Sequence, residues 1–285
     1  MNKKHYISIL ALFNLILLLS CNGGEMREEQ PKLISLKDIP QDKWEKLSQK
    51  KIYFGHQSVG FNILNGIKEI IKDNPMIKLN IVKTAELSDF KDGVFAHSGI
   101  GKNGYPKTKI DQFAKFVNNG IGNEADYAFF KFCYVDIRNE TDANKVFSEY
   151  KESMTKIINT YPNTTFIQVT APLEIELTMI QRMAKYAKDV VKKIIGKHRR
   201  RFYKGNINRH LFNEKIIEEY RDHAPIFDLA KIESTFSDGT RCSFEKDGKT
   251  YYSLAPKYTY DGKHLNKIGQ RKAAEQLLVL LANLP

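Results

Sequence analysis

Residues 51–71 read KIYFGHQSVGFNILNGIKEII, a short apolar run followed by a turn and by apolar residues at helical spacing. We expect a strand over 51–54 and a helix over 59–71, because apolar residues recur every three or four positions in the second segment. The loop Gly55-His56-Gln57-Ser58 then follows the carboxyl end of a strand. This strand-turn-helix unit is typical of a parallel α/β sheet.

The rest of the chain repeats the same alternation. Strand-like runs are found at 79–83, 127–133, 165–170 and 225–228, and helical segments at 144–160, 176–195, 213–220 and 265–284. Strands that alternate with helices predict a three-layer, doubly wound α/β fold with a mainly parallel sheet of about five strands. Ligands bind beyond the carboxyl ends of such strands, so the loops after 54, 83, 133 and 170 are the expected site.

Composition excludes several classes of protein. The chain has 285 residues, 45 Lys and Arg against 33 Asp and Glu, and a net charge of +12, with 42% hydrophobic residues. It is therefore neither disordered nor fibrous, and its three cysteines are too few for a disulfide scaffold and lack the paired spacing of a structural zinc site. No phosphate-binding or dinucleotide-binding glycine motif follows a strand, which argues against nucleotide binding.

The amino terminus is typical of an export signal. Residues 1–20 contain Lys3 and Lys4 followed by an apolar run that is too short to span a bilayer. The end, Leu18-Leu19-Ser20-Cys21, resembles the lipobox of bacterial lipoproteins, which implies acylation of Cys21. A plain signal peptide or an N-terminal anchor is the alternative. We expect a tether over 21–45, a domain over 46–285, and a place in the cell envelope, on the periplasmic or the cell-surface face.

Two loops carry candidate catalytic residues. A serine at position 58 stands at a helix N-terminus, where free N–H groups stabilise an oxyanion, although most serines at such a position cap the helix. Near the other end, Asp261 precedes His264 by three residues, a spacing that brings carboxylate and imidazole within reach. The alternative for this pair is a helix-terminal Asp and a surface His.

Taken in order, these loops resemble those of the SGNH or GDSL-type hydrolases. In that family a serine after the first strand is the nucleophile, and an Asp-x-x-His block before the last helix completes the triad. The resemblance implies that Ser58, His264 and Asp261 form a Ser-His-Asp triad. It covers the whole mature domain, and it is most specific in the block Asp-Gly-Lys-His-Leu-Asn-x-x-Gly at 261–269.

The chain departs from the family at the oxyanion hole. Gly55-His56-Gln57-Ser58 replaces Gly-Asp-Ser, and Cys133-Tyr134-Val135-Asp136 lacks the usual asparagine. A missing donor costs about a hundredfold or more in rate. The candidates for oxyanion or substrate contacts are Gly101, with Gly99 as its alternative, Asn103, His56, Gln57 and Asp136. Asp136 is alternatively a helix cap.

The expected activity is that of a lipid-anchored serine esterase that removes O-acyl groups, acetyl above all, from carbohydrate or related esters without a metal or organic cofactor. An O-acyltransferase with the same triad, or a surface lipoprotein that only binds a glycan or a partner, is the alternative. Residues 182–221 carry thirteen Lys and Arg against four acids. This basic region is either a solvated helix face or a site for an acidic polymer or anionic lipid. Export argues against nucleic acid as its partner.

Overall fold

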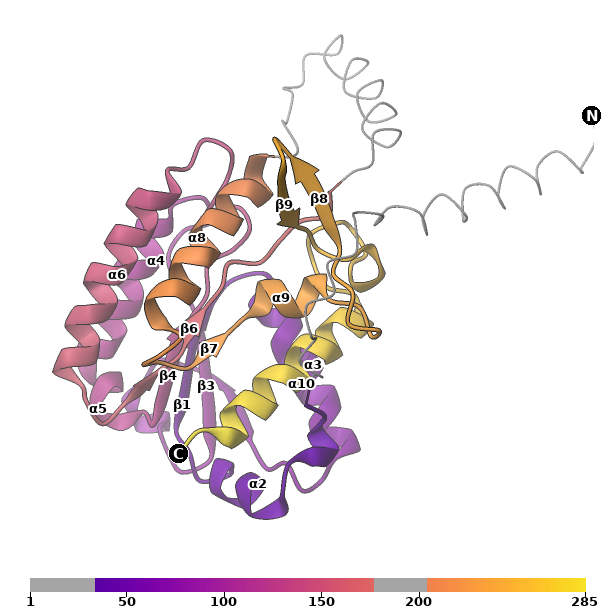
Figure 1. The fold of residues 1–285 in the computed structure, drawn as a ribbon. Helices are drawn as coiled ribbons and strands as arrows, with labels where there is room; N and C mark the ends of the chain where they lie inside the picture. Colours follow the sequence, from indigo (N-terminus) through magenta and orange to yellow (C-terminus); the bar gives the residue numbers. More distant parts are fainter. Residues whose placement is uncertain (1–33, 177–203) are drawn as a thin grey trace, which may run out of the picture.

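Five parallel strands form the central sheet, in the order β2-β3-β1-β4-β5 (Figure 1). The structure is a computed structural model, and it describes residues 34–176 and 204–285. The strands are β1 (Ile52–His56), β2 (Asn80–Lys83), β3 (Val94–Gly99), β4 (Tyr127–Phe130) and β5 (Thr165–Phe166). The predicted α/β class with a parallel sheet of about five strands is therefore confirmed.

Two smaller strand pairs accompany this sheet. β6 (Gln168–Val169) pairs in parallel with β7 (Ile226–Phe227), and Ile167 between β5 and β6 still donates to Ala128 of β4. β8 (Ser243–Lys246) and β9 (Lys249–Tyr252) form an antiparallel hairpin. The strand expected over 165–170 is thus interrupted once, and the short strand expected near 226 is present as β7.

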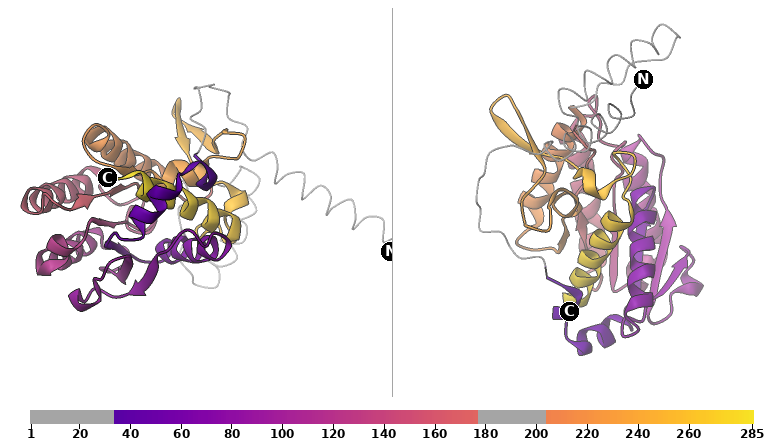
Figure 2. Two further views of the ribbon diagram at one scale, coloured as in Figure 1. Left: turned by 90° about the horizontal axis from the view of Figure 1, so that it is seen from below. Right: turned by 90° about the vertical axis from the view of Figure 1, so that its right-hand side faces the viewer.

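Helices cover both faces of the sheet (Figures 1 and 2). One layer contains α2 (Gln41–Leu47), α3 (Val59–Asp73), α9 (Leu229–Ser234) and α10 (Lys267–Asn283), and the other contains α4 (Pro106–Phe116), α6 (Ala143–Thr160) and α8 (Lys204–Tyr220). The short helical turns are Leu36–Asp38, Leu87–Asp89, Val117–Ile121, Gly122–Glu124 and Pro256–Tyr258. α3 and α10 lie side by side and make the most extensive helix contact in the molecule as described.

Alternation along each central strand explains the two layers. Successive side chains point to opposite faces, and both faces are buried here. Ile52 and Phe54 of β1 therefore enter the core under α3 and α10, whereas Tyr53 enters the core under α4 and α6. A strand that is apolar on both faces belongs in the middle of a covered sheet, which is where β1 lies.

Several expectations about element bounds need correction. Val94–Gly99 is the strand β3, between β2 and β1, and it was not among the strands expected from the sequence. The tether was expected to extend to residue 45, yet Ile39 and Trp44 are buried against the domain, so folded structure begins before residue 46. α8 begins nine residues earlier than expected, and α10 begins at Lys267. The helix expected over 176–195 falls almost wholly outside the described residues.

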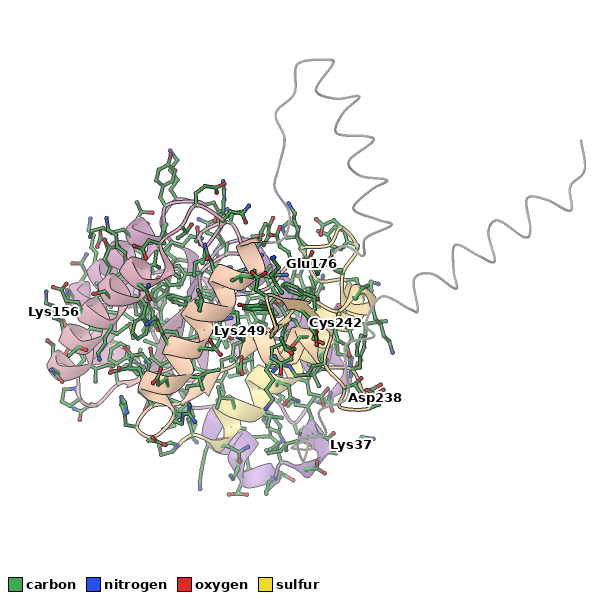
Figure 3. All side chains as sticks on the ribbon, turned by 45° about the horizontal axis from the view of Figure 1, so that its top comes forward. Lys37, Lys156, Glu176, Asp238, Cys242 and Lys249 are labelled. Carbon is green, nitrogen blue, oxygen red and sulfur yellow. The ribbon has the colours of Figure 1, made fainter. Side chains whose placement is uncertain are left out.

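Both cysteines of the described residues, Cys133 and Cys242, are buried, and Cys242 is labelled in Figure 3. Within 34–176 and 204–285, no helix combines the length and the apolar character that crossing a membrane requires.

Candidate active site

Ser58 lies at a sharp turn between β1 and α3. Its backbone has φ 45° and ψ −105°, a conformation that side-chain-bearing residues rarely adopt and that costs about 1–3 kcal/mol. The hydroxyl makes no capping hydrogen bond to α3. Reading Ser58 as a helix cap is therefore wrong, because its side chain is directed away from the helix amides.

The Ser58 hydroxyl instead begins a chain of hydrogen bonds. Its Oγ lies 2.6 Å from Nε2 of His264, and Nδ1 of the same ring lies 2.6 Å from Oδ2 of Asp261. The two ring nitrogens thus face a hydroxyl on one side and a carboxylate on the other. With Nδ1–H donated to Asp261, Nε2 is free to accept the proton of Ser58. The structure thus brings together Ser58, His264 and Asp261, the three residues that the sequence resemblance implies as a triad.

Asp261 is held by more than the histidine. Its Oδ1 accepts the backbone N–H groups of Lys263 at 2.9 Å and His264 at 2.7 Å. Partial burial acts to raise the pKa of Asp261, but the hydrogen bonds from His264 and Lys263 outweigh burial and lower it. The carboxylate is therefore ionised at neutral pH, as a partner of a histidine that takes up a proton must be.

Two further contacts fix the turn that carries His264. The Thr259 hydroxyl donates to the His264 carbonyl at 2.7 Å and accepts the Gly262 N–H at 2.9 Å. Gly262 has φ 84°, a value that favours glycine. Asn62 of α3 accepts the Leu265 N–H at 3.1 Å, which ties the helix behind Ser58 to this turn.

Aromatic rings flank the histidine on two sides. The Tyr134 ring lies edge-on to His264 at 5.6 Å between centroids, and the Tyr260 ring stacks on it at 6.1 Å. Tyr260 is 67% exposed, whereas the His264 side chain is 26% exposed. The site therefore opens to solvent beside a flat aromatic face. Sequence reasoning missed both tyrosines, although each adjoins a motif residue.

Gly101 does not fit the role of oxyanion donor that was expected of it. Its N–H donates to Oε1 of Gln112 at 2.6 Å, so this amide is already satisfied within the domain. Its φ of 54° and the approach of the Lys109 backbone, 2.6 Å from where a Cβ would lie, give the glycine a structural reason. The first-choice donor is thus corrected.

Gly99, the alternative, remains available. It is the last residue of β3 and is in register with His56 of β1, two residues before Ser58. Gln57 spans the same gap, because its Nε2 donates to the carbonyls of Ile100 and Gly101, both at 3.2 Å. The Ser58 N–H has no acceptor among the described residues. Through its two hydrogen bonds, Gln57 connects the loop after β1 to the loop after β3.

Asn103 and Asp136 meet through a lysine that sequence reasoning overlooked. Lys109 and Asp136 are fully buried, with Nζ 2.5 Å from Oδ2, and Lys109 also donates to Oδ1 of Asn103 at 2.8 Å. Asp136 accepts the N–H groups of Gly104 at 2.8 Å and Cys133 at 2.6 Å. Asp136 therefore joins two loops and does not cap α6, whose cap is Asp142.

His56 has a partner in the next strand. Its Nε2 lies 3.0 Å from Nδ1 of His97, and both rings are buried. Burial, with the lysines nearby, lowers the pKa of His56 to about 2 and that of His97 to about 4. The pair is therefore neutral at neutral pH, and His56, which is fully buried, is not exposed to a substrate.

Other expected features lie outside the described residues: the signal over 1–20, Cys21 and most of the basic region 182–221. Within the part of that region that is described, Arg209 is only 1% exposed. It pairs with Glu174 at 2.9 Å and donates to the carbonyls of Tyr134 and Ile137. Arg209 supports the Tyr134 loop and is not part of a charged surface.

Among 34–176 and 204–285 there is no group of three or more His, Cys, Asp or Glu residues placed to hold a metal ion. No family model and no curated protein matches the chain.

Solved structures do match it. A member of the lipolytic protein G-D-S-L family from Veillonella parvula is 13% identical, with 82% of this chain and 98% of that one covered and a TM-score of 0.44. The periplasmic domain of a lipopolysaccharide acetyltransferase from Salmonella Paratyphi A is 11% identical over 86% and 88%, with a TM-score of 0.44. A family 3 carbohydrate esterase from Clostridium thermocellum is 15% identical over 82% and 99%, with a TM-score of 0.40. The first of these structures is described as a member of the G-D-S-L family, whose motifs the sequence resembles.

Proposed function

We propose that the chain is a serine esterase of the SGNH type that removes O-acyl groups, with acetyl as the expected group, from carbohydrate. One observation carries this proposal: the unbroken relay from Ser58 Oγ through His264 to Asp261, with both links at 2.6 Å. Such a relay has little structural purpose at a solvent-open turn, and the strained backbone of Ser58 is typical of functional sites.

Acylation follows from the relay. Ser58 Oγ attacks the ester carbonyl carbon while its proton moves to Nε2 of His264. Asp261 stabilises the imidazolium that forms and holds the ring in the required tautomer. The carbon–oxygen bond to the alcohol then breaks, and His264 returns the proton to the leaving alkoxide. An acyl group remains on Ser58.

The oxyanion of the tetrahedral intermediate needs hydrogen-bond donors. Our proposed donors are the N–H of Ser58, two residues after the end of β1, and the N–H of Gly99, the last residue of the neighbouring strand β3. We propose the Asn103 side-chain amide as a third donor, because the Lys109 ammonium binds its Oδ1 and no described residue accepts a hydrogen bond from its Nδ2. This amide would replace the asparagine that the sequence lacks.

Deacylation uses the same groups in reverse. Water gives a proton to Nε2 of His264, attacks the acyl carbonyl and releases the acid, and Ser58 Oγ recovers the proton. If another alcohol takes the place of water, the acyl group is transferred to that alcohol as a new ester. None of these steps requires a metal or an organic cofactor.

The carbohydrate class is proposed from the setting of the site. The exposed Tyr260 ring beside His264 offers an apolar face with a polar tip, a surface that suits a sugar ring. The sequence of residues 1–21 supports export and lipid attachment at Cys21, where glycans are the accessible esters.

Acetate release tests the proposal. Purified protein is incubated with acetylated oligosaccharides and with a small aryl acetate, and free acetate is measured. We expect release by the wild type and none by Ser58→Ala. Added acceptor alcohols distinguish transfer from hydrolysis, since a transferase would form a new ester in place of acetate. A Ser58→Ala variant as active as the wild type would refute the role of this serine.

A further inference from the structure

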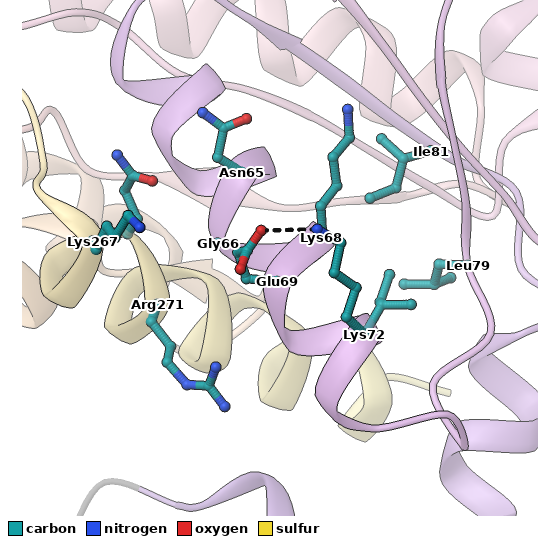
Figure 4. A pocket seen from close by; sticks show the side chains of 11 residues that line it. Asn65, Gly66, Lys68, Glu69, Lys72, Leu79, Ile81, Lys267 and Arg271 are labelled. Atoms are coloured by element: carbon teal, nitrogen blue, oxygen red, sulfur yellow. Dashed lines mark hydrogen bonds and ion pairs between the residues drawn. The ribbon is translucent and has the colours of Figure 1, made fainter.

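A cavity of about 710 Å³ lies over α3, between α10 and the edge strand β2 (Figure 4). Lys68 and Lys72 of α3 and Lys267 and Arg271 of α10 line it, and half-buried Ile81 of β2 lies in its wall. Glu69 is the single acidic residue of the lining. We call this cavity the α3 basin. None of its lining residues belongs to the basic region 182–221.

The positive charge of the basin is only partly neutralised. Lys72 pairs with Glu69 at 3.2 Å, and Arg271 pairs with Asp73 at 2.6 Å. Lys68 and Lys267 have no carboxylate within ion-pair distance in the described part of the chain. Two exposed ammonium groups therefore lie on neighbouring helices with no carboxylate partner in the described part of the chain, an arrangement that attracts an anion.

One face of α3 leads from the catalytic turn to the basin. Phe61, Asn65, Lys68 and Lys72 follow one another at intervals of four, three and four residues, so they share one face of α3. Phe61 is 41% exposed, and its ring meets that of His56 at 4.6 Å. At 1.5 Å per residue, Lys68 lies about 15 Å along the helix from Ser58.

The start of α10 also connects the basin to the catalytic turn. Lys267 is the first residue of α10 and follows His264 by three residues. Lys68, together with Lys83 of β2, also contributes to the lowered pKa of His97, after the larger effect of burial. The positive field of the basin therefore reaches the histidine pair under the Ser58 turn.

We propose that the α3 basin binds an anionic stretch of a polysaccharide whose acyl group is presented to Ser58. The proposal rests on the proposed function. A polysaccharide bound at Lys68 and Lys267 would carry its ester to Ser58, which lies about 15 Å from Lys68 along α3. Binding at such a distance raises the local concentration of the polymer and its rate of encounter with the site, without changing the chemistry.

The shape of the basin favours a polymer over a bilayer. Its cations stand around a hollow, and its apolar side chains Ile71, Leu79 and Ile81 are half-buried in the walls, where they cannot insert among lipids. A single flexible chain can follow a hollow, whereas a membrane surface is flat over this distance. Anionic vesicles nevertheless form one arm of the test.

The test compares two substrates in a charge-reversed double variant, Lys68→Glu with Lys267→Glu. One substrate is p-nitrophenyl acetate, and the other is acetylated polygalacturonate. We expect unchanged kcat/KM on the small ester and a loss of about tenfold or more on the polymer at low salt. The loss should shrink as salt is raised to about 0.5 M, because exposed charges are then screened.

A matched variant controls for net charge. Lys145→Glu with Lys156→Glu reverses two exposed lysines on α6, in the opposite helix layer (Lys156 is labelled in Figure 3). This variant should keep its activity on the polymer. Equal losses in both double variants, or no loss in the basin variant, would overturn the proposal. The neutral pair Lys68→Gln with Lys267→Gln gives a second reading if the reversed pair unfolds.

Binding separates this proposal from the proposed function. The affinity of the purified protein for polygalacturonate without acetyl groups is measured by calorimetry and needs no catalysis. Binding that is lost in the basin variant supports the basin even if no ester is cleaved, in which case only the proposed function fails. Binding unchanged in the basin variant, or loss confined to phosphatidylglycerol vesicles, would refute a polysaccharide site.

Discussion

Backbone strain at Ser58 makes a measurable prediction about stability. At φ 45° a residue with a Cβ bears about 1–3 kcal/mol of strain, and glycine does not. Ser58→Ala and Ser58→Gly both remove the hydroxyl and its bond to His264. Their free energies of unfolding therefore differ only through backbone strain and through the general effect of replacing alanine by glycine. We expect both variants to lack esterase activity, and the glycine variant to be the more stable.

The difference in stability between glycine and alanine without strain is measured at Asp142, the N-cap of α6. There φ is −75°, so the same two substitutions carry no such strain. In urea unfolding, the advantage of glycine over alanine at position 58 should exceed that at position 142 by about 1–3 kcal/mol. Each kcal/mol corresponds to roughly 2–4 °C in Tm for a domain of this size. Equal differences at the two positions would refute the strain at Ser58.

Three further predictions concern the relay and the buried charges. Asp261→Asn should lower kcat on a small ester by a hundredfold or more with little change in Tm, because an amide favours the wrong tautomer of His264; a kcat within tenfold of wild type would count against the relay. The free energy of unfolding should fall as pH drops from about 6.5 to 4, because His56 and His97 bind protons less readily in the folded than in the unfolded chain. The slope is at most about 1.4 kcal/mol per pH unit for each histidine. Urea titrations at successive pH values should show a smaller fall in His97→Gln. Lys109→Met should destabilise the fold by about 3–5 kcal/mol by leaving Asp136 buried without its cation, and Asp136→Leu in the same chain should restore part of the loss. A double variant as unstable as the sum of the single ones would contradict this pairing.

Local patterns explain what could be predicted from the sequence. The β1–α3 unit is visible because a short apolar run is followed by helical spacing, and Asp261 and His264 are three residues apart, so their contact needs only one turn. The meeting of Ser58 with His264, 206 positions apart, rests on the topology of the sheet. Parallel strands bring loops from distant segments to one edge, which makes such a meeting predictable from the order of strands and helices.

The remaining features depend on contacts that no local pattern marks. Val94–Gly99 was not predicted as a strand: a histidine, a serine and a glycine follow its apolar residues, and pairing with β1 and β2 on both sides makes it a central strand. Gly101 was the first choice for an oxyanion donor, and only the structure places Gln112 on its N–H. Lys109 lies on a helix that was not predicted, and a fully buried lysine is rarely inferred from sequence.

The most direct test of the central claim is chemical labelling of the serine. The protein is treated with a fluorophosphonate, and the adduct is located by mass spectrometry after digestion. The relay predicts one adduct on Ser58 that is lost in His264→Ala, because only a serine whose proton is accepted by His264 is nucleophilic enough to react. The absence of any adduct on Ser58 in the folded wild-type protein, or equal labelling in His264→Ala, would contradict the account.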